Sequence, residues 1–177
     1  MSSNIRSLAL ALAAATLATT AHAQATSSQS TNVGGTIFQP IVLSKTADLQ
    51  FGTIVRPATG SGVVTVSQSD GTRSLAGDGA LLVGGPHTAP TRAAFSVSGE
   101  GGQAISINVP ANLNMTRSGG SELIAVTLTA SATSATLTGA LGAPGSTTFG
   151  VGGSIPVAPT TASGAYSGSF QVTVSYN

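Results

Sequence analysis

The last residues of the sequence, TTASGAYSGSFQVTVSYN at 160–177, give the strongest indication of the fold class. Side chains of an extended strand point alternately to its two faces. Here one face carries Tyr166, Gly168, Phe170, Val172, Val174 and Tyr176, and the other carries Ser167, Ser169, Gln171, Thr173, Ser175 and Asn177. The alternation predicts a half-buried β-strand, whose backbone donors and acceptors require a partner strand.

Similar alternation recurs upstream, in short runs bounded by Gly, Pro, Asn or Ser. The runs are 63–66, 93–97, 105–109 and 124–128. About seven to nine strands at this spacing predict a single all-β, antiparallel β-sandwich or barrel. The Ala- and Thr-rich run 129–141 favours a strand with a loop over a helix, because its β-branched residues suit strands.

Glycine pairs mark the expected turns. Asp70-Gly71 lies between two alternating runs and predicts a tight hairpin turn, since both residue types tolerate positive φ. Further chain breaks are expected at Gly142–Gly145 and at Gly152-Gly153.

Residues 1–23 have the layout of a cleaved secretory signal, with Arg6, an apolar run and the triplet Ala21-His22-Ala23. The apolar run of about eleven residues is too short for a bilayer core, which needs about twenty. We therefore predict a signal peptide at 1–23, a flexible extension at 24–32 and one β-sandwich domain at 33–177. Export to the periplasm, cell surface or an extracellular fibre is expected, with no membrane span in the mature chain.

Charged residues make up only 6% of the chain, against about 25% in ordinary globular proteins. No basic patch for nucleic acid is expected from so few charges. A surface dominated by Ser, Thr, Asn, Gln and Gly suits a protein that contacts copies of itself, although many exported bacterial β proteins share this composition. Cysteine is absent, so the domain must be stabilised by core burial or by a partner strand.

Residues able to carry chemistry are few and scattered. His87 is the one histidine after residue 23, and the carboxylates Asp48, Asp70, Asp78, Glu100 and Glu122 lie in separate segments. A single imidazole without cysteine cannot build an ordinary zinc site, and no G-x-S-x-G or phosphate-loop motif occurs. We expect no cofactor, no metal and no enzymatic activity. Asp70, Asp78 and Glu100 are expected in turns or loops.

Three separated segments resemble a widespread uncharacterised family of small exported bacterial domains. They are PIVLSKTADLQFG at 40–52, AFSVSG at 94–99 and GAYSGSFQVTVSY at 164–176. That family is similar to spore-coat-U-type and archaic chaperone-usher pilin subunits. The resemblance implies an immunoglobulin-like sandwich that lacks its final strand and is completed by an N-terminal extension donated from the next subunit. A periplasmic chaperone and an outer-membrane usher are the further partners it implies. Many pilins contain cysteine, and this chain departs from them in having none.

The residues near the mature start fit a donated strand. Val33, Ile37, Ile41 and Leu43 share one face of an extended segment at 32–43. Pro40 removes a backbone donor, so the run divides there into an extension and the first strand of the domain itself. The alternative is that the whole run is the first strand of a self-complete sandwich.

The expected function is structural: an exported subunit of a fimbria, surface fibre or coat that assembles by β-strand pairing between copies or related subunits. Val33, Ile37, Ile41 and Leu43 are the predicted donor residues, and Phe170, Val172, Val174 and Tyr176 are the predicted acceptor residues. The alternative is a secreted binding module that recognises carbohydrate or a surface protein through its loops.

Overall fold

The computed structural model describes residues 26–177 of the 177-residue chain, so the predicted signal peptide lies outside the described residues. The chain divides into two compact units, Met1–Gly35 and Thr36–Asn177. In the first unit, residues 26–35 are exposed and form neither helix nor strand. Over the described part of the chain, no helix is long and apolar enough to cross a membrane.

The second unit is built from antiparallel strands, and residues 36–177 contain no helix. The predicted all-β antiparallel sandwich class is therefore confirmed. Its strands are β1 (Val42–Ala47), β2 (Ile54–Val55), β3 (Gly62–Val66), β4 (Arg73–Gly77), β5 (Ala80–Leu81), β6 (Ala93–Glu100), β7 (Ala104–Asn108), β8 (Asn112–Arg117), β9 (Leu123–Ala130), β10 (Ser134–Thr136), β11 (Pro144–Val157), β12 (Tyr166–Ser167) and β13 (Thr173–Tyr176).

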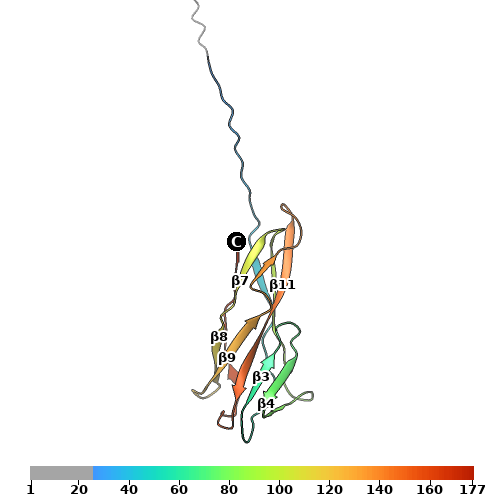
Figure 1. Ribbon diagram of the computed structural model, residues 1–177, viewed down its shortest axis with the longest axis vertical. Helices are drawn as coiled ribbons and strands as arrows, with labels where there is room; N and C mark the ends of the chain where they lie inside the picture. The colour runs from blue at the N-terminus through green and yellow to red at the C-terminus, as the bar shows by residue number, and fades with distance from the viewer. Residues whose placement is uncertain (1–25) are drawn as a thin grey trace, which may run out of the picture. The chain divides into compact units, whose positions relative to one another are not determined.

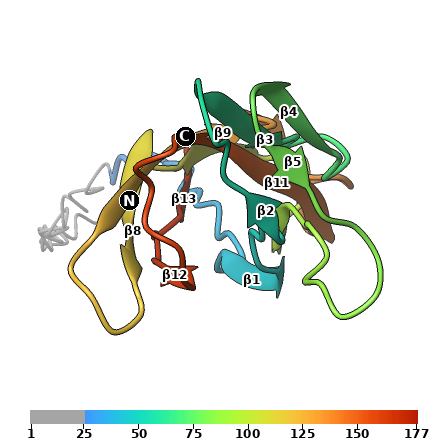
Figure 2. The same ribbon diagram turned by 90° about the horizontal axis from the view of Figure 1, so that it is seen from below.

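Strand β11 organises the sheets. The main sheet has the order β1-β6-β11-β9-β8-β12, and β3 also pairs with β11 and carries β4 on its other edge. A three-stranded sheet, β10-β7-β13, and the short pair β2-β5 complete the unit. Figure 1 shows β3 and β4 at the end opposite to β7 and the C-terminus, and in Figure 2 the strands curl into an arch.

The core forms where the inward faces of these strands meet. β3 and β9 alternate between buried and exposed residues along their length, as period-two burial requires. Phe95 of β6 stacks on Phe149 of β11 with ring centroids 5.1 Å apart. The other buried apolar side chains include Val64, Val66, Val97, Ile105, Ile107, Val126, Leu128, Leu137, Val151, Ile155 and Val157.

Of the two expected glycine breaks, the one at Gly142–Gly145 is confirmed, because Gly142 lies in the turn before β11. The break expected at Gly152-Gly153 is wrong. β11 runs unbroken for 14 residues through Gly145, Gly152 and Gly153. A Cβ on Gly152 would collide with the carbonyl oxygen of Val66 in β3, and one on Gly153 would lie 2.8 Å from the carbonyl oxygen of Thr127 in β9. These glycines therefore let three strands approach closely. They do not end the strand.

The predicted strand at the C-terminus is divided. β12 pairs with β8 and β13 pairs with β7, while residues 168–172 between them have no strand partner in the described structure. The N-terminal edge is divided in the same way into β1 and β2. The described unit consequently has 13 strand segments, more than the predicted seven to nine, because irregular stretches interrupt both edges.

The hairpin at Asp70-Gly71 is confirmed. β3 and β4 pair from Val66↔Arg73 to Gly62↔Gly77, and Gly71 has a φ of 77°. The carboxylate of Asp70 accepts hydrogen bonds from the backbone N–H of Thr72 at 3.1 Å and from its hydroxyl at 2.8 Å. These bonds shape the turn locally.

Gly71→Ala is expected to lower the free energy of unfolding by about 1–2 kcal/mol, because residues with a Cβ rarely adopt this positive φ. The added Cβ would also lie 3.2 Å from the backbone nitrogen of Arg92. Gly71→Asn should cost less, since asparagine tolerates the left-handed region. Urea unfolding of both variants measures the difference, and equal stability of the alanine variant and the parent would contradict it.

Candidate functional site

The C-terminal strand presents one edge that carries no partner. The four predicted acceptor residues Phe170, Val172, Val174 and Tyr176 are half-buried and pack against the core. They alternate with the exposed residues Gln171, Thr173 and Ser175. β13 pairs with β7 on one edge and stands at the end of its sheet. Its other edge therefore lacks a strand neighbour within the described residues.

The N-terminal strand also presents an edge without a partner. β1 pairs with β6, Gln50 forms a bridge with Thr91, and β2 pairs with β5. No strand pairing joins β1 or β2 to β12 or β13 over residues 36–177. Figure 2 shows β1 and β2 on one side of the arch and β12 and β13 on the other. Two edges thus face each other without backbone pairing.

A groove of about 800 Å³ lies beside β2 and β12 and is bounded by the segments 49–56 and 161–168. β1 and β13 do not line it. We call it the edge groove. Thr88 and four apolar residues from β8, β9 and β11 complete its lining; the four are Met115, Ile124, Ile155 and Val157. Arg56 is the one charged residue in the described lining. The groove therefore has an apolar floor between two segments that carry both polar and apolar residues.

Arg73 stabilises the segment 49–56, which we call the first wall of the groove. Its guanidinium donates hydrogen bonds to the carbonyl oxygens of Phe51 at 2.8 Å, Thr53 at 3.0 Å and Leu82 at 2.6 Å. Gly52 has a φ of 73°, and a Cβ there would lie 2.5 Å from Arg73 Nη1. Glycine is thus needed for the guanidinium to reach both neighbouring carbonyls.

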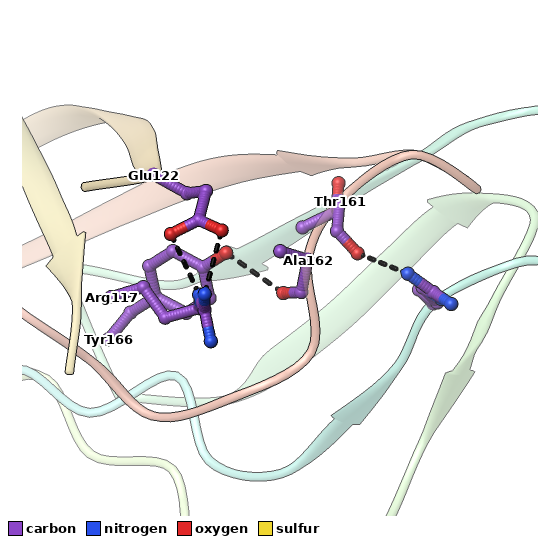
Figure 3. A network of polar contacts seen from close by, with 6 residues as sticks. Arg117, Glu122, Thr161, Ala162 and Tyr166 are labelled. Carbon is purple, nitrogen blue, oxygen red and sulfur yellow. Dashed lines mark hydrogen bonds and ion pairs between the residues drawn. The ribbon is translucent and has the colours of Figure 1, made fainter. Parts of the chain in front are cut away.

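Hydrogen bonds stabilise the segment 161–168, which we call the second wall of the groove (Figure 3). Tyr166 donates its hydroxyl proton to the carbonyl oxygen of Ala162 at 2.8 Å, and Arg56 Nη1 donates to the carbonyl oxygen of Thr161 at 2.6 Å. Arg117 forms a bidentate ion pair with Glu122, in which Nε donates a hydrogen bond to Oε2 at 2.9 Å and Nη2 donates one to Oε1 at 2.7 Å. Arg56 links the two walls, because it lies in the first and Thr161 in the second.

The pair with Arg117 lowers the pKa of Glu122 from 4.5 to about 2, chiefly through the hydrogen bonds from the guanidinium. A depressed pKa in the folded state stabilises the domain above the unfolded value, and this contribution is lost as pH falls through about 2. NMR titration of the carboxyl carbon should show Glu122 still ionised at pH 3.5. In Glu122→Gln, stability should lose this part of its pH dependence, and a titration midpoint at the ordinary value would contradict the pairing. The effect on stability should be small, because the pair is exposed.

The predicted donor residues fall into two groups. Val33 and Ile37 are each 92% exposed. Ile41 and Leu43 are half-buried against the core, and Leu43 pairs with Val97 of β6. Ile41 and Leu43 thus lie in or beside the domain's own first strand, whereas Val33 and Ile37 are exposed among the described residues.

Most of the titratable residues occupy separate surface positions. Asp48 pairs with Lys45 at 2.6 Å, and His87 lies exposed in a loop. Glu100 differs from the sequence expectation, because it ends β6 and is only 2% exposed. Within residues 26–177, no three His, Asp or Glu side chains gather where a metal ion could be held.

The sequence did not identify the edge groove. The predicted acceptor residues lie at 170–176, whereas the hollow lies beside 161–168 and 49–56. Leu49-Gln50-Phe51-Gly52 was the available signal. Its glycine marks the point where the first wall leaves regular strand geometry.

Comparison with known proteins covers almost the whole second unit. No curated protein and no solved structure matches the chain significantly. A family model matches residues 41–176, from the residue before β1 to the last residue of β13. The chain therefore belongs to the family described as "Domain of unknown function (DUF4402)".

Proposed function

We propose that this protein is an exported structural subunit of a fimbria, surface fibre or coat, and that it assembles by β-strand pairing between copies or related subunits. The observation that carries the proposal is the edge groove, in which two unpaired strand edges face each other over an apolar floor. Added strands bind such edges through backbone hydrogen bonds and through alternate side chains in pockets.

The N-terminal extension has the character that this groove requires. Val33 and Ile37 are exposed apolar residues on one face of an extended chain, with Gly35 between them on the same face. Residues 24–39 contain no charged side chain. An uncharged strand can enter an apolar groove without the cost of burying a charge.

The groove also refines the proposed acceptor. Phe170, Val172, Val174 and Tyr176 remain part of it as the C-terminal continuation of the second wall, and the segments 161–168 and 49–56 bound its open part. Ile41 and Leu43 pack against the core of their own domain, and Leu43 pairs with Val97 in β6. The proposed donated residues are therefore Val33 and Ile37. The resemblance to pilin subunits supports the same arrangement, with a periplasmic chaperone and an outer-membrane usher as further partners.

Detergent gels test the proposal. The chain is expressed with residues 1–23, and periplasmic and surface material is run with and without boiling. Inserted strands should resist cold detergent, because release requires a whole strand to unzip. A ladder that collapses to monomer on boiling is the expected result. A single monomer band in both lanes would overturn assembly by strand insertion and would direct attention to the loops as a binding surface.

A further inference from the structure

The backbone of Gln39 is held on both sides by side chains from distant strands. Its N–H donates to Oε2 of Glu100 at 3.1 Å, and its carbonyl oxygen accepts the hydroxyl proton of Tyr176 at 2.7 Å. The Tyr176 hydroxyl oxygen in turn accepts the backbone N–H of Glu100 at 2.6 Å. We call this arrangement the Gln39 clamp. Both backbone groups of Gln39 are thus hydrogen-bonded, although no strand of the described residues 26–177 pairs with it.

The residues that form the clamp are held in place by the surrounding domain. Glu100 is 2% exposed, and its second oxygen accepts a hydrogen bond from the backbone N–H of Gly142. A buried carboxyl group is tolerated only where such donors satisfy it. A Cβ on Gly99 would collide with the Tyr176 hydroxyl, so glycine is needed there for the hydroxyl to approach.

Phe38, the residue before Gln39, is also held in place. The ring of Phe38 packs on that of Tyr176 with centroids 5.5 Å apart and planes tilted by 60°. The preceding residue, Ile37, is 92% exposed. The clamp therefore marks the point where the chain changes from anchored residues to exposed ones.

Anchoring at this point opposes a reversal of the chain. A tight turn is commonly closed by a hydrogen bond from the carbonyl of one residue to the N–H three residues later. Gln39 already uses both of its backbone groups in the clamp, and Pro40 has no N–H. A turn that must be closed by the N–H of Gln39 or of Pro40 therefore cannot form while the clamp is intact.

We infer that the Gln39 clamp keeps the extension out of its own edge groove and so reserves that groove for the extension of a second copy. This inference rests on the proposed function, because it presupposes that the groove accepts the extension. The clamp holds Gln39 through its backbone groups, so it controls the direction of the extension whatever the side chain of Gln39.

Cross-linking separates insertion within one chain from insertion between chains. The chain has no cysteine, so Ile37→Cys and Ala165→Cys place one thiol on the extension and one in the groove lining. A bismaleimide with a six-carbon spacer tolerates small differences in register. Joined chains form a ladder on a denaturing gel, and a chain joined to itself stays monomeric and is identified by mass.

Cross-linking of the Ile37→Cys, Ala165→Cys double variant is compared with and without the further substitution Tyr176→Phe. This substitution removes the hydroxyl group and leaves the ring. The two hydrogen bonds lost should raise the ratio of intrachain to interchain product by about 5- to 30-fold. Glu100→Gln provides a second test in the same direction, should Tyr176→Phe fail to fold. Amide hydrogen exchange at Gln39 should accelerate most in Glu100→Gln, which replaces an oxygen of the group that accepts this N–H, and less in Tyr176→Phe, which keeps that acceptor.

The outcomes distinguish the two proposals. Interchain product in the parent and increased intrachain product in the variants support the clamp. An unchanged ratio despite faster exchange at Gln39 would refute the clamp's role while leaving strand assembly intact. Intrachain product dominating in the parent would also refute it. Absence of either product would overturn the proposed function, and the clamp's role with it.

Discussion

Ile37→Asp is expected to abolish assembly and leave the domain folded. Ile37 is 92% exposed, so a carboxylate there costs the free monomer almost nothing. In a donated strand the same carboxylate would enter a groove whose described lining has only one charged residue, Arg56, and an unpaired buried charge is strongly unfavourable. On unboiled detergent gels the ladder should disappear, while the urea unfolding of the monomer should change by less than about 0.5 kcal/mol.

Thr36→Asp is the matched control. Thr36 is exposed and adjacent to Ile37, so its side chain points to the opposite face of an extended strand. The same charge should then face away from the groove floor, and the ladder should persist. Unaltered polymerisation of Ile37→Asp, or equal loss in both variants, would show that Ile37 is not a groove-facing donor residue.

Gly152→Ala is expected to have the largest effect on stability, lowering the free energy of unfolding by about 3 kcal/mol or more. A Cβ at this position would lie 2.5 Å from the backbone nitrogen of Gln68 and 2.8 Å from the carbonyl carbon of Ser67, in addition to its collision with Val66. All three contacts are backbone atoms, so relief requires β3 to separate from β11. Given a typical total stability of about 5–15 kcal/mol, thermal unfolding should shift down by about 10 °C.

Gly34→Ala serves as its control, because a Cβ there meets no atom within 4 Å and the residue has no positive φ. Thermal and urea unfolding should be unchanged in this variant. Wild-type stability of Gly152→Ala would mean that β3 and β11 do not approach each other as closely as the glycine requires.

Much of the fold was predictable from short segments. The alternation from Tyr166 to Tyr176 correctly predicted which side chains face the core, with Gly168 as the exception, because strand geometry assigns faces residue by residue. The Asp70-Gly71 turn was equally local. Gly152 and Gly153 misled the prediction, since glycine marks both a chain break and a close approach of neighbouring strands.

The site was less predictable. Glu100 is followed by Gly101-Gly102 and has the sequence context of a loop residue, yet it is buried because backbone donors from Gln39 and Gly142 converge on it. The groove was missed because its two walls carry no common motif. Polar and small residues at 161–168 gave no sign that they flank apolar residues from β8, β9 and β11.

The all-β class, the faces of the terminal strand and the apolar positions of the extension could be read from the chain alone, because each follows from the order of neighbouring side chains. The edges that lack a partner, the position of the groove and the contacts of Gln39 appear only in the folded domain. Those features join distant parts of the chain, as Arg56 and Thr161 do across 105 residues. Pairing between distant strands depends on the packing of the whole core, which no local pattern specifies.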